Sequence, residues 1–195
     1  MEYLTIATES ESVYTEQRSK FLSFAHPVAT SEEAKQIAKD YAKRFFDARH
    51  VCWAYMIGAE RTEFLSTDNG EPSGTAGKPI LGQINSFGLT NIIVIVVRYF
   101  GGIKLGTSGL IAAYRKAARQ AIEAAEIIEC HEMGEISITF PFMAINAVMK
   151  IIKSNSLKIK SQEFDNTCHI VLSLPLISLQ PISAMLLDVD GLCID

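Results

Sequence analysis

The feature that most constrains the fold is a continuous β-branched run from Asn91 to Arg98, which leads into a glycine-rich loop at residues 101–109. Such a run is typical of a strand covered on both faces, although periodicity alone leaves a buried helix open. After the loop, apolar residues recur at helical spacing and form the stripe Leu110, Ala113, Tyr114, Ala117, Ala121 and Ile122. The sequence therefore predicts an α+β fold in which helices cover a sheet.

The chain divides into two patterns of elements. Residues 3–66 read as short strands around one helix, whose start is marked by the capping-box residues Thr30 and Glu33. From Glu135 onward the order of elements is β-α-β-β-α-β, which is the ferredoxin-like arrangement. Because the composition also changes near Cys130, we expect two domains, 1–130 and 131–195.

Length and composition exclude several classes of protein. The chain has 195 residues, 48% apolar and 21% charged, which is a globular rather than a disordered composition. No segment approaches the roughly 20 apolar residues of a membrane-spanning helix, and residues 1–10 do not resemble a signal peptide. The four cysteines form no C-x-x-C pair and no evident disulfide framework. We therefore expect a reduced, cytoplasmic protein with no membrane contact, of unknown oligomeric state.

Charge is distributed unevenly along the chain. The net charge is −4, yet residues 72–122 contain no Asp or Glu and carry the basic residues Lys78, Arg98, Lys104, Arg115, Lys116 and Arg119. Residues 131–195, by contrast, hold four basic and seven acidic residues. Since a phosphate-rich partner responds to the facing patch more than to the total charge, a polyanion is predicted to bind the first domain.

Two glycine-rich loops each precede a predicted helix: the first glycine loop at residues 67–77 and the second glycine loop at residues 101–109. A helix start leaves N–H groups unpaired and carries partial positive charge, and glycines let a ligand approach the backbone. Hydroxyl and basic side chains complete the candidate anion site, which comprises Ser73, Thr75, Lys78, Arg98, Lys104, Thr107, Ser108 and Arg115. Neither loop is a Walker A or dinucleotide motif, and tight turns or close helix–strand packing would explain the glycines equally well.

Two acidic residues flank the first glycine loop. Asp68 and Glu71 are candidates for general acid–base chemistry or for binding a divalent ion that bridges to phosphate. Turn formation by the Asp-Asn-Gly sequence is the alternative explanation for them.

Other chemically suggestive pairs favour structural roles. His50 and Cys52 would share one strand face, but no orienting acid is evident, so a packed cysteine and a structural histidine are favoured. The Cys-His pairs at residues 130–131 and 168–169 would point their side chains to opposite faces of a strand, which disfavours a metal site. We expect neither a bound metal nor a cofactor.

Three segments resemble the IMPACT/YigZ-like family: DARHVCWAY at residues 47–55, DNGEPSGTAGKPIL at residues 68–81 and VRYFGGIKLG at residues 97–106. The last two are long and specific, and the resemblance covers essentially the whole chain. It implies an N-terminal α+β sandwich like the second domain of a small-subunit ribosomal protein and domain IV of elongation factor G, followed by a ferredoxin-like domain. It also implies that eukaryotic relatives act in translational control under amino-acid starvation through protein partners, and it implies no settled activity for bacterial members.

Three functional hypotheses remain open. The favoured one is a non-catalytic binding module that holds RNA, a ribosomal surface or a translation factor, with backbone phosphates supplying most of the affinity. An enzyme acting on a phosphorylated small molecule or nucleotide is the second, with Asp68 or Glu71 as base or metal ligand. The third is a purely protein-interaction module that has no anion site.

Overall fold

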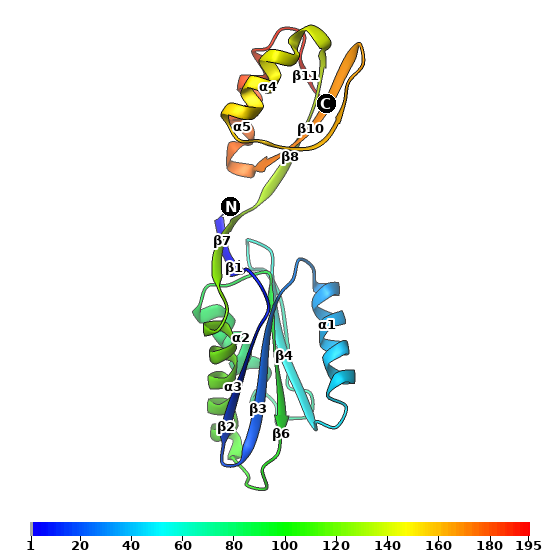
Figure 1. Cartoon of the computed structure of the whole chain (residues 1–195). Helices are drawn as coiled ribbons and strands as arrows, with labels where there is room; N and C mark the ends of the chain where they lie inside the picture. The colour runs from blue at the N-terminus through cyan, green and yellow to red at the C-terminus, as the bar shows by residue number, and fades with distance from the viewer. Residues whose placement is uncertain (1) are drawn as a thin grey trace. The chain divides into compact units, whose positions relative to one another are not determined.

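The computed structural model describes residues 2–195 and divides into two compact units, Glu2–Cys130 and His131–Asp195. The elements associated with the first unit are β1 (Glu2–Ile6), β2 (Ser10–Glu16), β3 (Ser19–Pro27), α1 (Ser31–Arg44), β4 (His50–Ile57), β5 (Glu63–Thr67), α2 (Gly77–Ser86), β6 (Ile92–Tyr99), α3 (Gly106–Glu123) and β7 (Ile127–His131). Its main sheet is antiparallel and has the order β2-β3-β6-β4-β5. Figure 1 shows α2 and α3 on one face of this sheet and α1 on the other.

Strand β6 accounts for this layering. Every residue from Ile92 to Arg98 is buried, so the prediction of a strand covered on both faces is confirmed. The even-numbered apolar residues pack with α2 and α3, and the odd-numbered ones pack beneath α1. Because side chains alternate along a strand, the next residue on the α2/α3 face is Arg98, a charged side chain at the end of an apolar row.

Helix α1 begins where the capping box predicts. The Thr30 hydroxyl accepts a hydrogen bond from the Glu33 N–H at 3.2 Å. The Glu33 carboxylate accepts a hydrogen bond from the N–H of Ala29 at 2.7 Å. Ala29 immediately precedes the N-cap residue Thr30. Both ends of the motif thus satisfy backbone donors that the first turn leaves open.

Helix α2 begins at Gly77, and an acidic side chain from the preceding loop supports its start. Asp68 Oδ1 accepts hydrogen bonds from the N–H groups of Ala76 at 3.0 Å and Gly77 at 2.8 Å, while Oδ2 accepts one from Gly74 at 2.7 Å. Position 77 has no room for a side chain, because a Cβ there would lie 2.7 Å from the backbone nitrogen of Thr67. The first glycine loop is therefore wrapped around the Asp68 carboxylate and packed against the end of β5.

The second unit has the predicted ferredoxin-like fold. Its elements are β8 (Met133–Pro141), the 3₁₀ turn η1 (Phe142–Ala144), α4 (Ile145–Ser154), β9 (Lys158–Glu163), β10 (Thr167–Pro175), the 3₁₀ turn η2 (Leu176–Ser178), α5 (Leu179–Leu187) and β11 (Cys193–Ile194). The sheet order is β11-β8-β10-β9, and each hydrogen-bonded pair of strands is antiparallel. Alternate residues of β8 and β10 enter one core with Val148 and Ile152 of α4.

One element was not predicted from the sequence. Strand β7 pairs with β1 in a separate two-stranded sheet. Its consecutive Ile127 and Ile128 break the apolar–polar alternation that identifies a strand, which explains why the pattern was missed.

The helices described in residues 2–195 include no candidate for a membrane span.

The Asp68 contacts predict a pH-dependent contribution to stability. Partial burial on its own raises the pKa of Asp68, but the amide hydrogen bonds from Gly74, Gly77 and Ala76 and the charge of Lys78 outweigh it, so the pKa lies below its usual range. We expect Asp68→Ala to lower the free energy of unfolding by about 2 kcal/mol at neutral pH. Because the folded-state pKa is depressed, this difference persists down to a pH of about 4 and shrinks as the pH falls further.

The measurement is urea unfolding followed by the fluorescence of Trp53, which is the single tryptophan and lies on β4. Asp40→Ala serves as control, since Asp40 is an exposed residue of α1, and it should change stability by less than about 0.5 kcal/mol. A difference between wild type and Asp68→Ala that stays constant at low pH would contradict the assigned role.

Candidate functional site

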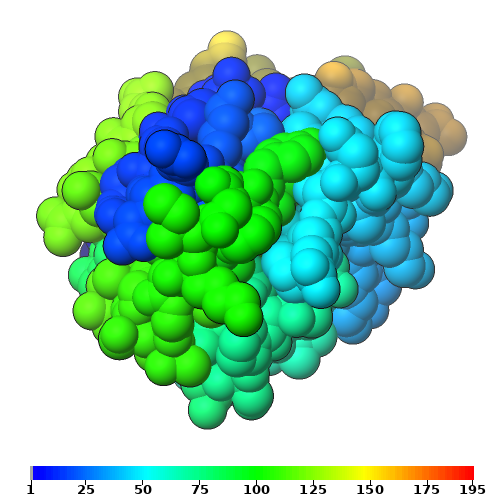
Figure 2. All heavy atoms as spheres, turned by 90° about the horizontal axis from the view of Figure 1, so that it is seen from below, coloured from blue at the N-terminus to red at the C-terminus, as the bar shows by residue number. Residues whose placement is uncertain are grey.

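The candidate site lies at one end of the main sheet, on the face covered by α2 and α3. His50 at the start of β4 is the register partner of Arg98 near the end of β6, and Phe21 of β3 pairs with Arg98 from the other side. Figure 2 views this end of the unit, where the second glycine loop (green) lies beside the segment around residue 50 (cyan) and the β2–β3 turn (blue).

Both glycine loops border a single cleft of about 460 Å³. The first loop contributes Gly70, Glu71 and Pro72 to its wall. The other lining residues come from β4 and its approach, from β6, and from the second loop and α3: Arg49, His50, Arg98, Phe100, Lys104, Leu105, Gly106, Thr107 and Leu110. A space of this size suits a small ligand or one unit of a polymer.

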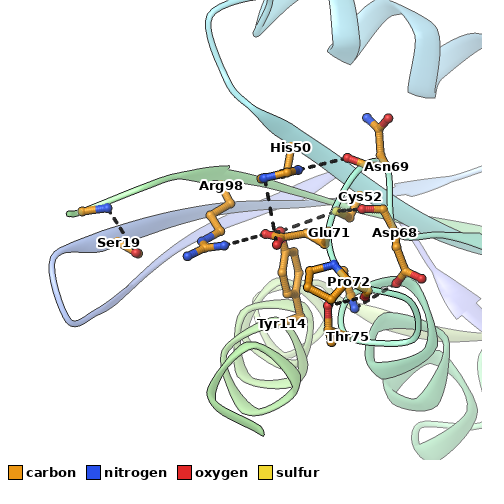
Figure 3. Close-up of polar contacts among 12 residues, drawn as sticks. Ser19, His50, Cys52, Asp68, Asn69, Glu71, Pro72, Thr75, Arg98 and Tyr114 are labelled. Atoms are coloured by element: carbon orange, nitrogen blue, oxygen red, sulfur yellow. Dashed lines mark hydrogen bonds and ion pairs between the residues drawn. The ribbon is translucent and has the colours of Figure 1, made fainter. Parts of the chain in front are cut away.

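The innermost charged group of the cleft is Glu71, whose side chain is only 3% exposed. Its Oε1 accepts one hydrogen bond from Arg98 Nη1 and another from the Tyr114 hydroxyl, each at 2.8 Å. Figure 3 shows Arg98 of β6 and Tyr114 of α3 directed at this carboxylate. One loop residue is thereby fixed to the sheet and to a helix at once.

His50 occupies the opposite side of Glu71. Its Nδ1 lies 3.1 Å from the backbone carbonyl oxygen of Asn69, and since a carbonyl only accepts, Nδ1 carries the proton of that hydrogen bond. Its Nε2 then faces Glu71 Oε2 at 4.0 Å. Gly70, with φ of +85°, lets the loop pass beneath the imidazole, where a Cβ would lie 3.3 Å from Nδ1. The histidine is thus oriented towards the cleft rather than packed into the core.

Cys52 is a packed core residue, as expected. Its thiol donates to the Asp68 carbonyl oxygen at 2.9 Å, and burial raises the pKa of Cys52 to about 12. Burial likewise raises the pKa of Tyr114 far above its usual value. Since the thiolate is the reactive form of cysteine, the structure gives no support to a His50–Cys52 nucleophile–base pair.

Arg98 is buried between two aromatic rings. Its guanidinium carbon lies 5.7 Å from the ring centres of both Phe21 and Phe100, which favours a cation. Within residues 2–195, the hydrogen bond to Glu71 is the only one that the Arg98 guanidinium donates, and its buried Nε has no partner. Such a buried donor without a partner is rare, and it shows that the fold does not satisfy every donor of the Arg98 side chain.

The two glycine loops differ in how their helix starts are satisfied. In the first loop, the amides expected to hold an external anion are already bonded to Asp68. Helix α3, after the second loop, begins at Gly106 with Leu105 at the N-cap and no side-chain cap. Of the two helix starts that follow the glycine loops, the α3 start is therefore the one where an external anion can approach backbone amides.

Close packing fixes the base of the second loop. A Cβ at Gly101 would lie 2.0 Å from the backbone carbonyl carbon of Arg18, so only glycine fits against the β2–β3 turn. The Gly101 N–H also donates to the hydroxyl of buried Ser19 at 3.2 Å. These contacts hold the segment that carries Lys104 at the mouth of the cleft.

The structure does not bring all the predicted site residues together. Arg98, Lys104 and Thr107 line the cleft, whereas Lys78 and Arg115 line a second pocket, of about 390 Å³, between α2 and α3. The exposed Ser73 and Ser108 line neither of these two. Thr75 was predicted as an anion-binding donor, but it is buried and its hydroxyl donates to the Pro72 carbonyl oxygen at 2.7 Å, so it builds the loop instead.

The two candidate acids have different roles. Asp68 Oδ1 accepts two backbone amide hydrogen bonds and Oδ2 accepts one, which favours the loop-forming role of this carboxylate. Glu71 lines the cleft, and its Oε2 accepts no hydrogen bond from residues 2–195. Within that range, no three His, Cys, Asp or Glu side chains gather as a metal site would require.

Sequence reasoning missed two contributions to the cleft. Arg49 lies just before β4, and its only signal was its place next to His50 in the first family-like segment. His50 itself was assigned a structural role, because the carbonyl that orients it, from Asn69, leaves no trace in side-chain chemistry.

Comparison with known proteins places this geometry in a family. The model of the Impact N-terminal domain matches residues 17–122. The IMPACT family member YigZ of Escherichia coli is 30% identical over 174 residues, which cover 88% of this chain and 85% of that one. The IMPACT family member YvyE of Bacillus subtilis is 36% identical over 127 residues, which cover 65% of this chain but only 58% of that one.

A solved structure agrees over almost the full length. The crystal structure of a hypothetical protein aligns with a TM-score of 0.75 at 28% identity, and the match covers 99% of this chain and 96% of the other. The human Protein IMPACT also matches, over 95 residues. With the domain model, the bacterial relatives and the shared fold in agreement, this chain belongs to the IMPACT family.

Proposed function

We propose that this protein is a translation-associated regulatory binding protein whose N-terminal domain holds RNA or another polyanionic surface, such as that of the ribosome, at the cleft between its glycine loops. The observation that carries the proposal is that both loops border one cleft with Arg49, Arg98 and Lys104 on its walls. Membership of the IMPACT family, which includes eukaryotic relatives, is consistent with a regulatory role in translation.

The arrangement of charge supports a phosphate-bearing ligand. Lys104 and Arg49 are exposed and lie where phosphates can reach them without desolvation of a buried group. The start of α3 adds backbone amides next to them. Lys78 and Arg115 form a second group of cations between α2 and α3, which can contact further phosphates of a longer chain.

The first test is the salt dependence of binding. We expect the double substitution Lys78→Ala with Lys104→Ala to weaken binding of a single-stranded RNA. It should also reduce the slope of log affinity against log salt by about 1.4, since each lost phosphate contact on a single strand removes about 0.7. Filter binding over about 50 to 200 mM salt measures both quantities.

The matched control is Lys35→Ala with Lys39→Ala. Both lysines are exposed on α1, which covers the opposite face of the sheet, so affinity and slope should stay at the wild-type values. If the Lys78/Lys104 variant binds with wild-type affinity and slope, neither the cleft nor the pocket that Lys78 lines between α2 and α3 is the binding surface.

The second test separates stacking from charge. Phe100 lines the cleft and is 52% exposed, so its ring is available to a base. We expect Phe100→Ala to weaken binding of single-stranded RNA by about 1–3 kcal/mol while the salt slope stays unchanged, because stacking releases no counterions.

Phe46→Ala is the control for this change. Phe46 is 85% exposed and is not part of the cleft lining, so its removal should leave affinity unaltered. Equal losses in the two variants would mean that a general loss of surface aromatics, rather than the cleft, explains the effect.

A further inference from the structure

We infer that the floor of the cleft recognises a ribose hydroxyl, so that the site takes a ribonucleotide unit and discriminates against DNA. This inference rests on the proposed function and names the ligand chemistry of the same site. It depends on Glu71 and His50, which the anion-binding proposal leaves without a role.

The charged group at the floor of the cleft, Glu71, is a hydrogen-bond acceptor and not a cation. Glu71 is the most deeply buried charged side chain there, and Oε1 is fully used by Arg98 and Tyr114. Its Oε2 accepts no hydrogen bond from residues 2–195 and lies too far from His50 Nε2, at 4.0 Å, for a direct one. A phosphate oxygen placed here would meet a carboxylate, so the part of the ligand that reaches the floor must be a hydrogen-bond donor and not an anion. In a nucleic acid the donors are neutral groups such as a ribose hydroxyl.

A hydroxyl group matches the pair formed by Glu71 and His50. Because Nδ1 of His50 is committed to the Asn69 carbonyl, Nε2 is the ring nitrogen presented to the ligand. A hydroxyl has one donor and two acceptor lone pairs. It can donate to Glu71 Oε2 and, when the imidazole is charged, accept from His50 Nε2–H in the same position.

The rest of the cleft fits the remainder of a ribonucleotide. Lys104 and the start of α3, which has no side-chain cap, also line the cleft and can bind the phosphate. In RNA the 2′-hydroxyl is adjacent to the 3′-phosphate, so one sugar can place the hydroxyl at Glu71 and the phosphate among the cations. Phe100 at the rim offers its face to the base. The 2′-hydroxyl is the group by which proteins distinguish RNA from DNA.

The test compares three versions of one short fluorescent oligoadenylate, with 2′-hydroxyl, 2′-deoxy and 2′-O-methyl sugars, by anisotropy at a single salt concentration. We expect the 2′-hydroxyl strand to bind about tenfold more tightly than the other two, which is the order of one hydrogen bond to a charged group. Base sequence and phosphate number are constant, so the ratio of affinities isolates the sugar.

Two substitutions test whether the RNA-to-DNA affinity ratio arises from the floor of the cleft. We expect Glu71→Gln to bring the RNA-to-DNA affinity ratio close to one. Because this change also weakens the buried contact with Arg98, His50→Ala provides a second variant that leaves the Glu71–Arg98 pair intact and should reduce the ratio as well. Lys35→Ala on α1 should keep the wild-type ratio.

The outcomes separate the two proposals. If wild-type protein binds RNA and DNA equally, ribose recognition is wrong. The proposed function then stands if affinity falls steeply with salt in the filter-binding titration. If the preference for RNA survives in folded Glu71→Gln and His50→Ala, the sugar is read elsewhere and the inference is overturned. If none of the strands binds, both proposals fail.

Discussion

The buried pair of Glu71 and Arg98 is the interaction on which the candidate site depends. It joins the first glycine loop to the central strand, and the Tyr114 hydroxyl adds α3 to the same carboxylate. Taking two charges out of water is costly, and removing one partner of such a pair typically costs about 3–5 kcal/mol because the other charge is left buried. Well-packed apolar residues could join the same elements without that cost. Because buried charged groups in clefts cluster at functional sites, this pair marks the cleft as a candidate site.

The two glycine loops look alike in sequence and act differently in the structure. In the first loop, the Asp68 carboxylate accepts hydrogen bonds from the backbone amides of Gly74, Ala76 and Gly77, so these donors are satisfied within the loop. The second carries no internal anion at the start of α3 and keeps Lys104 exposed beside it. Backbone amides that favour negative charge thus bind an internal carboxylate at the start of α2, whereas those at the start of α3 have no side-chain cap.

Much of the fold was predictable because it follows from short-range patterns. The β-branched run of β6, the capping box of α1 and the order of elements after Glu135 each determine an element from neighbouring residues.

The site was predictable only in part. Composition identified Arg98, Lys104 and Thr107, but it could not show that Thr75 turns inward or that Asp68 bonds its own loop. Those roles depend on backbone geometry, which the side-chain types do not encode.

The role of His50 also depends on backbone geometry, and it was therefore not predictable from side-chain types. It was assigned a structural role because no acidic residue was evident to orient it, whereas a main-chain carbonyl does so. Charge patterns along the chain therefore locate a basic face well, and they locate the neutral and acidic groups within it poorly.

The glycine at position 101 gives the cleft one rigid wall. Since its backbone rests directly on that of Arg18, the strand hairpin formed by β2 and β3 acts as a fixed stop behind the segment that bears Lys104. A side chain at position 101 would have to displace this paired hairpin as well as the loop. The position of the second glycine loop is thus fixed by contact between two backbones rather than by side chains.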